Sequence, residues 1–118
     1  MRAFEISKPN VYTGERVLKY IKSIHHDFQL PNLILQHRAW ILTNVPVDQL
    51  KTPDEHHDDP YNRVPEVDWD HVNDIHVNDI TKNPIVVDNN SWIIDGNHRA
   101  IAARERGVKT IPAFVPYK

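Results

Sequence analysis

The sequence predicts an α/β (α+β) fold, and three observations support this prediction. The chain has 118 residues, a length that suits one domain. Residues 13–28 carry apolar side chains at helical spacing. Residues 84–115 follow the order strand, turn, strand, helix and strand. We therefore expect helices and strands to share one small domain.

The N-terminal region predicts one amphipathic helix. Thr13 is a favoured helix-capping residue. The apolar residues that follow it at helical spacing are Val17, Tyr20, Ile21, Ile24 and Phe28. We expect the helix to end near residues 25–27, before Pro31. The dipole at a helix C-terminus accounts for His25 and His26 there without a functional role.

The middle of the chain predicts short strands and a long loop. Residues 33–36 and 40–43 are β-prone and form either a hairpin through His37 and Arg38 or one bent strand. Residues 45–50 continue into a strand end and a turn. Residues 51–65 contain three prolines and several acids, so we expect a long loop, and long loops in small domains are often functional.

A tandem repeat, HVNDI followed by HVNDI, occupies residues 71–80. We expect a single helix here, although Val, Asn and Asp are weak helix formers. One face of that helix would carry four apolar residues: Trp69, Val72, Ile75 and Ile80. His71 and His76 would point in different directions and would not share a metal ion. The three tryptophans, Trp40, Trp69 and Trp92, are expected in the core.

The C-terminal third gives the clearest local signals. Two strands are expected at residues 84–88 and 91–94, joined by a turn at Asn89 and Asn90. An Ala-rich helix follows at residues 98–106, with Gly107 as its C-terminal cap. Residues 110–115 form the last expected strand.

The composition excludes several classes of function. The chain has no cysteine, which rules out a disulfide framework, a thiolate nucleophile and Cys-ligated metals. Its formal net charge of −2 lacks the basic excess of proteins that bind DNA non-specifically. Nucleic acid would need a local basic patch, for which the candidates are Arg99, Arg104, Arg106 and Lys109. No apolar run spans a membrane and no signal peptide is evident, so we expect no membrane partner and a cytoplasmic location.

The sharpest motif is IIDGNHRA at residues 93–100. Gly96 permits a tight turn between a strand and a helix. The backbone amides of Asn97, His98 and Arg99 would then lie at a helix N-terminus, where they and the helix dipole favour an anion such as phosphate.

The side chains of this motif add further chemistry. Arg99 offers a forked donor that matches phosphate. Asp95 could hold a metal ion, a ligand hydroxyl or a backbone amide, and His98 could donate to phosphate or shuttle a proton. The alternative is a plain structural joint, in which Asp95 caps the helix and Arg99 is solvated.

The C-terminal region resembles the ParB/sulfiredoxin superfamily. The resemblance rests on the PIVVD strand, the DGNHR turn, the Ala-rich helix and the IPAFV strand, and it covers residues 83–115. A looser match covers VPVDQLKTPDE at residues 45–55. The resemblance implies a small mixed sheet with packed helices at residues 40–118, preceded by a helical extension at residues 1–39, in a single domain.

The resemblance also implies a ligand and a branch of the superfamily. A nucleotide or phosphate would be held at Gly96, Asn97, His98 and Arg99, and ATP, ADP or CTP with Mg²⁺ is the expected ligand. Sulfiredoxin chemistry is excluded because the catalytic cysteine is absent. The DGNHR turn is similar to that of the ParB-like nuclease and free-serine-kinase branches. Kinases of that branch use an acid after the first strand as a base, and Glu55 is its counterpart here.

Two classes of function stay open. An enzyme would catalyse phosphoryl transfer or phosphodiester or nucleotide hydrolysis, with Glu55, Asp95 and His98 as catalytic residues. A non-catalytic accessory or inhibitor module would use the same surface to bind nucleotide, DNA or protein. No metal ligands are assigned, because the neighbouring His56 and His57 would point in opposite directions on an extended loop.

Overall fold

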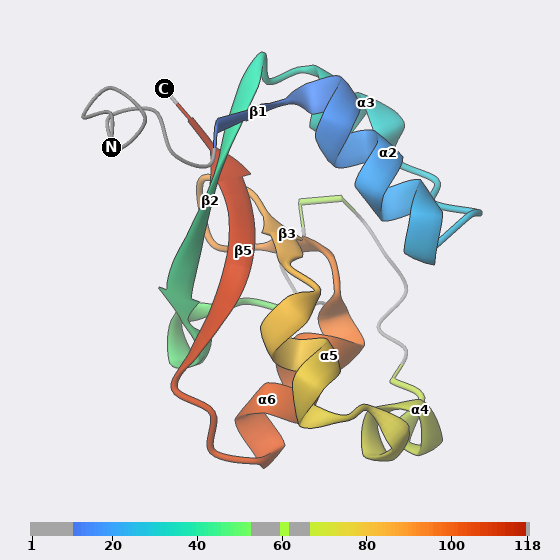
Figure 1. Cartoon of the computed structure of the whole chain (residues 1–118), viewed down its shortest axis with the longest axis vertical. Coiled ribbons are helices and arrows are strands. Elements are labelled where there is room, and N and C mark those ends of the chain that lie inside the picture. The colour runs from blue at the N-terminus through green and yellow to red at the C-terminus, as the bar shows by residue number, and fades with distance from the viewer. Residues whose placement is uncertain (1–10, 53–59, 62–66, 118) are drawn as a thin grey trace, which may run out of the picture.

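The structure of the chain, a computed structural model, describes residues 11–52, 60–61 and 67–117. Within these residues, five strands form one sheet in the order β1-β2-β5-β3-β4 (Figure 1). The strands are β1 (Val11–Thr13), β2 (Ala39–Pro46), β3 (Ile85–Val87), β4 (Ile93–Asp95) and β5 (Thr110–Pro116). β3 pairs with β5 in parallel, and the other neighbours pair antiparallel. The predicted α/β fold with a small mixed sheet is confirmed.

The helices fall into two groups along the chain. The first group is α2 (Gly14–Ile24) and α3 (Pro31–Leu35), and the second is α4 (Trp69–Asp74), α5 (Val77–Lys82) and α6 (Asn97–Glu105). A 3₁₀ helix, η1 (Val47–Gln49), follows β2. Figure 1 shows α2 and α3 side by side at one end of the molecule and α4–α6 at the other.

The two groups of helices bury two separate cores against the sheet. Along β3 the side chains alternate, as a strand requires. Ile85 and Val87 join the core that contains residues of α4–α6, whereas Val86 joins the core that contains residues of α2 and α3. Both β3 and β4 are buried throughout, as expected for strands with helices on both faces.

The N-terminal helix forms as predicted and packs on the sheet. The Thr13 hydroxyl accepts a hydrogen bond from the Arg16 amide at 3.2 Å, which caps the first turn of α2. Val17 and Ile21 are buried against the sheet. The helix ends at Ile24, with His25 as its C-cap. The preceding β1 pairs with β2, so residues 11–13 add an edge strand to the sheet.

The strand predicted at residues 33–36 is wrong, because residues 33–35 belong to α3 and Gln36 is its C-cap. Pro31 occupies the first turn of α3, where its fixed φ and missing N–H suit a helix. Burial of Ile34 outweighs the β propensity of this short run. His37 and Arg38 consequently form a bend into β2 rather than a hairpin turn.

The single helix predicted over the HVNDI repeat is also wrong. The first copy lies in α4 and the second in α5, with a break at Ile75 and His76. The Asp79 carboxylate accepts the His76 amide, and such local capping by Asp competes with a continuous helix. Trp69 is 52% exposed and so is not part of the core.

The C-terminal order of strand, turn, strand, helix and strand is confirmed. α6 begins one residue earlier than expected and is capped by Arg106, after which Gly107 has a positive φ of 71°. Trp40 and Trp92 are buried, as predicted. The segment after η1 also borders β4, because Lys51 forms an isolated parallel bridge with Trp92.

Candidate functional site

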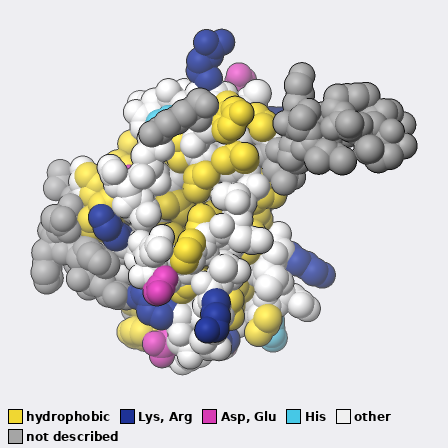
Figure 2. All heavy atoms as spheres, turned by 90° about the vertical axis from the view of Figure 1, so that its left-hand side faces the viewer, with side chains coloured by type: hydrophobic (Ala, Val, Ile, Leu, Met, Phe, Trp, Pro, Cys, Tyr) yellow, Lys and Arg dark blue, Asp and Glu magenta, His cyan; other side chains and the backbone are white. Residues whose placement is uncertain are grey.

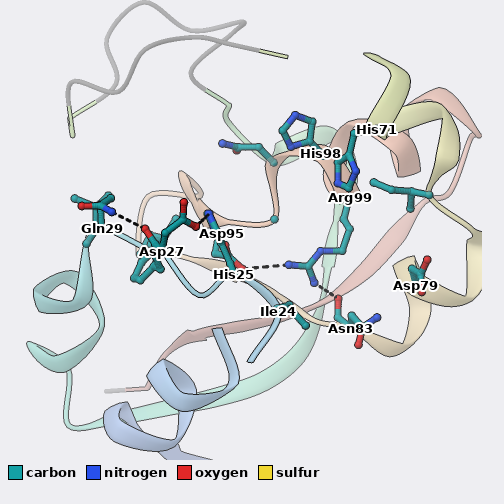
Figure 3. A pocket seen from close by; sticks show the side chains of 16 residues that line it. Ile24, His25, Asp27, Gln29, His71, Asp79, Asn83, Asp95, His98 and Arg99 are labelled. Carbon is teal, nitrogen blue, oxygen red and sulfur yellow. Dashed lines mark hydrogen bonds and ion pairs between the residues drawn. The ribbon is translucent and has the colours of Figure 1, made fainter. Parts of the chain in front are cut away.

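A pocket of about 740 Å³ opens beside the turn between β4 and α6 (Figure 3). Three parts of the chain line it: the end of α2 with the loop to α3, the α4–α5 region, and the β4–α6 turn. The lining residues used below are Ile24, His25, Asp27, Phe28, Leu30, His71, Ile75, Asp79, Ile94, Asp95, Asn97, His98 and Arg99. The lining therefore combines apolar side chains from all three parts with polar side chains, and the latter include those at the start of α6.

The β4–α6 turn depends on Gly96. Its φ of +103° is one that residues with a side chain rarely adopt. A Cβ atom here would lie 2.5 Å from Cγ2 of Ile85, so the backbone packs directly on β3. The tight turn expected from the sequence is confirmed.

Among the residues that the structure describes, no side chain caps the N-terminus of α6. Gly96 is the N-cap residue, and its carbonyl accepts the amide of Ala100. The amides of Asn97 and Arg99 in the first turn precede the helical hydrogen-bond ladder. Asn97 also has a buried side-chain oxygen, Oδ1, without a hydrogen-bond partner among the described residues. Both features leave polar groups at the pocket that suit a ligand or water.

Asp95 does not cap the helix, which corrects the structural alternative considered above. Its side chain is only 7% exposed and accepts from two directions. Oδ2 lies 3.1 Å from a guanidinium nitrogen of Arg99, and Oδ1 lies 3.2 Å from Nδ1 of His25. Asp95 therefore joins the α6 wall of the pocket to the N-terminal extension.

Arg99 is not solvated, which corrects the second half of that alternative. Its side chain is 13% exposed. One guanidinium nitrogen donates to the carbonyls of Asn83 and Pro84 at 2.6 and 2.9 Å, and the other donates to Asp95. Arg99 cross-links α6 to the end of α5, the start of β3 and the end of β4.

His25 contacts the site, although the sequence analysis explained it by the helix dipole alone. Its Nδ1 faces Asp95, and its Nε2 lies 3.1 Å from Oδ1 of Asp27. The ring packs edge-on against Phe28 with centroids 6.2 Å apart. Figure 3 shows His25, Asp95 and Arg99 following one another along the pocket wall.

His98 and His71 lie together on the other side of the pocket (Figure 3). Their ring centroids are 5.0 Å apart in an edge-to-face arrangement. Nε2 of His98 accepts a hydrogen bond from the Asp68 amide at 3.1 Å. In a neutral ring this fixes the proton on Nδ1, so His98 has a defined tautomer.

Tyr20 completes the network behind Arg99. Its hydroxyl donates to the Pro84 carbonyl at 2.7 Å and accepts from Arg99 at 3.3 Å. Burial raises the pKa of Tyr20 above its usual value; Arg99 opposes this rise and the Asp95 carboxylate adds to it.

We expect Tyr20 to ionise above the usual tyrosine range. Because the unfolded chain would release this proton first, its contribution to stability is present below about pH 10 and is lost as the pH rises through the folded pKa. An ultraviolet difference titration of the wild-type chain against Tyr20→Phe isolates this group. A difference signal centred at or below the usual tyrosine pKa would contradict the expectation.

The basic residues around α6 do not act as one free patch. Arg99 is engaged inside the pocket wall. Arg104 donates to the Leu50 carbonyl, and Arg106 donates to the Val72 and Asn73 carbonyls. Figure 2 shows Lys and Arg side chains scattered singly over the side of the molecule on which β2 and β5 lie, beside a band of hydrophobic side chains.

Two further predictions concern metals and membranes. Glu55, His56 and His57 lie outside the described residues. Within the part of the chain that the structure describes, no three His, Asp or Glu side chains are grouped as a metal site. None of the helices described is long and apolar enough to cross a membrane.

No protein-family model and no curated protein sequence matches the chain. Its structure is similar to that of a Pnob8-like ParB-N domain, with a TM-score of 0.47 and 21% identity, over 67% of this chain and 31% of that one. It is also similar to C-terminally truncated ParB of Caulobacter crescentus complexed with CTP-γ-S, with a TM-score of 0.42 and 23% identity, over 65% of this chain and 44% of that one. The match therefore spans less than half the length of each of these two solved chains.

Tyr20 and His25 link the N-terminal extension to the pocket, and the sequence did not predict this role for either of them. His25 and Asp95 are 70 positions apart, and Tyr20 and Arg99 are 79 apart. No local pattern reports such pairs, because they form only once α2 is packed on the sheet. The single available signal is that both residues lie on the predicted N-terminal helix or at its end.

Proposed function

We propose that the chain binds a nucleotide or another phosphorylated ligand, with a phosphate at the N-terminus of α6. The observation that carries this proposal is the uncapped first turn of α6 at the wall of a 740 Å³ pocket. Amides and dipole at a helix N-terminus attract anions. The volume lies within the range of small-molecule sites, about 300–1,000 Å³.

The shape of the lining suits a ligand with two unlike ends. The polar end would lie at the β4–α6 turn. The other end would contact apolar side chains of the lining, which are Ile24, Phe28, Leu30, Ile75 and Ile94. A phosphate attached to a base or another flat, weakly polar group has this character.

The charges of the described lining favour entry of the phosphate with a cation. Three carboxylates, those of Asp27, Asp79 and Asp95, face one guanidinium, which Asp95 already occupies. A nucleotide would meet repulsion unless Mg²⁺ accompanied it. The Oδ1 of Asn97, which has no hydrogen-bond partner in the described part of the chain, is an oxygen ligand of the kind that Mg²⁺ accepts, with phosphate oxygens and water completing the shell of the ion. ATP, ADP and CTP with Mg²⁺ are therefore the ligands to test first, CTP also because the similar Caulobacter protein was solved with CTP-γ-S.

The chemistry that we propose after binding is phosphoryl transfer or hydrolysis of a phosphodiester or nucleotide, as in a ParB-like nuclease or kinase. Glu55 would orient the attacking hydroxyl or water, and His98 would donate to the phosphate. Asp95 would hold His25 and Arg99 in place at the pocket wall. The alternative is a non-catalytic module that binds a nucleotide, DNA or a protein, and both versions are proposed for a cytoplasmic setting.

The binding proposal is tested with Asn97→Asp. This change keeps the size of the side chain and puts a negative charge at the first turn of α6, where the helix dipole favours it and so protects the fold. In the absence of Mg²⁺, like charge next to the bound phosphate should lower its affinity at least about tenfold. Isothermal titration with ATP, ADP, CTP and a short DNA duplex, each with and without Mg²⁺, measures the change.

The matched control is Asn90→Asp. It makes the same chemical change at an exposed turn at the other end of β4 and should leave affinity unaltered. Equal affinities for Asn97→Asp and Asn90→Asp would refute a phosphate at α6. Once a ligand is found, Glu55→Gln separates the two classes, because an enzyme would lose turnover and keep binding, whereas a binding module has no turnover to lose.

A further inference from the structure

We propose that His25, from the N-terminal extension, is a binding residue of the pocket and that its Nε2–H donates to an anionic oxygen of the ligand. On binding, that oxygen replaces the Asp27 carboxylate, which holds Nε2 in the free protein. This inference rests on the proposed phosphate site. It adds a donor from a part of the chain that the superfamily resemblance does not cover.

The position of the His25 ring is fixed from behind. Asp95 accepts at Nδ1, at 3.2 Å, and Asp95 is itself buried and held by Arg99. Phe28 packs against the ring from the α2–α3 loop. A carboxylate at one ring nitrogen orients a histidine and presents the other nitrogen outward. His25 presents Nε2 in this way, and it is also among the residues that line the pocket.

The contact of Nε2 with Asp27 is more exposed to solvent than the contact of Nδ1 with Asp95. Its partner, Asp27, is 83% exposed on the loop after α2, whereas Asp95 is 7% exposed. An exposed ion pair contributes little to stability because water competes for both charges. The Asp27 contact is therefore replaceable, and the Asp95 contact is not.

The two contacts also indicate which hydrogen bonds the His25 ring can make. Each ring nitrogen faces a carboxylate oxygen, which accepts and cannot donate. A ring N–H that donates suits either contact. His25 thus supplies a hydrogen-bond donor at a wall whose guanidinium, Arg99, is already engaged. A phosphate oxygen is a stronger acceptor than an exposed carboxylate and would take the outward N–H.

The test uses His25→Ala, with His26→Ala as its matched control. His26 is the adjacent histidine, is exposed and does not line the pocket. Isothermal titration with pyrophosphate, Mg²⁺–ATP and Mg²⁺–CTP should show affinity at least about tenfold lower in His25→Ala, as for loss of a charge-assisted hydrogen bond. His26→Ala should bind like wild type. The urea midpoint of each variant monitors folding.

A second variant should raise the affinity for the probes rather than lower it. Asp27→Asn removes the competing acceptor and one negative charge, so affinity for the same probes should rise severalfold. As a direct readout, pyrophosphate should shift the ring ¹⁵N signals of His25 and leave those of His26 in place. This measurement needs no mutation and so does not depend on variant folding.

The outcomes separate this inference from the proposed function. One pattern of results refutes the role of His25 alone. In that pattern, wild type binds a probe, Asn97→Asp no longer binds it, and His25→Ala binds it like wild type. The phosphate site then stands. Weaker binding in Asp27→Asn would likewise refute the exchange, since Asp27 would then be assisting the ligand. If wild type binds none of the probes, both proposals fall.

Discussion

Replacing Arg99 with alanine is expected to destabilise the fold by about 3–5 kcal/mol, the range for breaking a buried ion pair from one side. The substitution would leave the Asp95 carboxylate buried with His25 alone beside it. It would also remove the donor to the Asn83 and Pro84 carbonyls, where α5 joins β3. Urea denaturation followed by circular dichroism measures the free energy of unfolding.

Arg106→Ala is the matched control for this prediction. Arg106 follows the same helix and also donates to two backbone carbonyls, but it is exposed and its bonds are 3.3 Å long. Its loss should reduce the free energy of unfolding by less than about 1 kcal/mol. If the two variants unfold at the same urea concentration, the network around Arg99 does not stabilise the fold as argued.

The role of Arg99 also decides how the ligand site is to be probed. From the sequence alone, Arg99 is the obvious phosphate donor in the DGNHR turn. In the structure its guanidinium holds the pocket wall together, so loss of binding in Arg99→Ala would follow from either role. Asn97→Asp avoids this ambiguity, because it changes charge at the turn without removing a buried contact.

The C-terminal half of the sheet could be predicted because its signals are local. Gly96 and Gly107 mark the two ends of α6, and the buried strands before and after it are short apolar runs. The motif therefore identified the turn, the helix start and the residues that surround the uncapped amides. Even the placement of Trp92 in the core followed from alternation along one strand.

The rest of the site could not be predicted because it depends on how distant segments pack. Burial of Ile34 turns a β-prone run into α3, and this places the α2–α3 loop beside the pocket. The identical HVNDI copies differ in the same way, since Val72 is buried and Val77 is exposed. His25 is indistinguishable from His26 in sequence, and only its contact with Asp95 separates them.

Gly96→Ala is expected to destabilise the fold by about 2–6 kcal/mol, and it should affect the site as well. Backbone strain at a φ of +103° contributes about 1–3 kcal/mol. A new Cβ at 2.5 Å from Ile85 Cγ2 adds overpacking of about 1–3 kcal/mol, because Ile85 is fully buried and has no room to move. The free energy of unfolding in urea measures the sum.

Two further variants separate the free-energy cost of backbone strain at Gly96 from the cost of steric overlap with Ile85. Gly107→Ala also places a side chain at positive φ, 71°, but its Cβ meets no atom within 4 Å, so it should cost only about 1–2 kcal/mol. In a double-mutant cycle with Ile85→Ala, the 2.5 Å contact with Cγ2 is gone and only the 2.9 Å contact with the Cβ of residue 85 is left, so Gly96→Ala should be less destabilising there than in the wild-type background. Additive effects would mean that β3 does not set the position of the turn. The tight packing of Gly96 on β3, and with it the placement of the α6 amides at the pocket, would then need another cause.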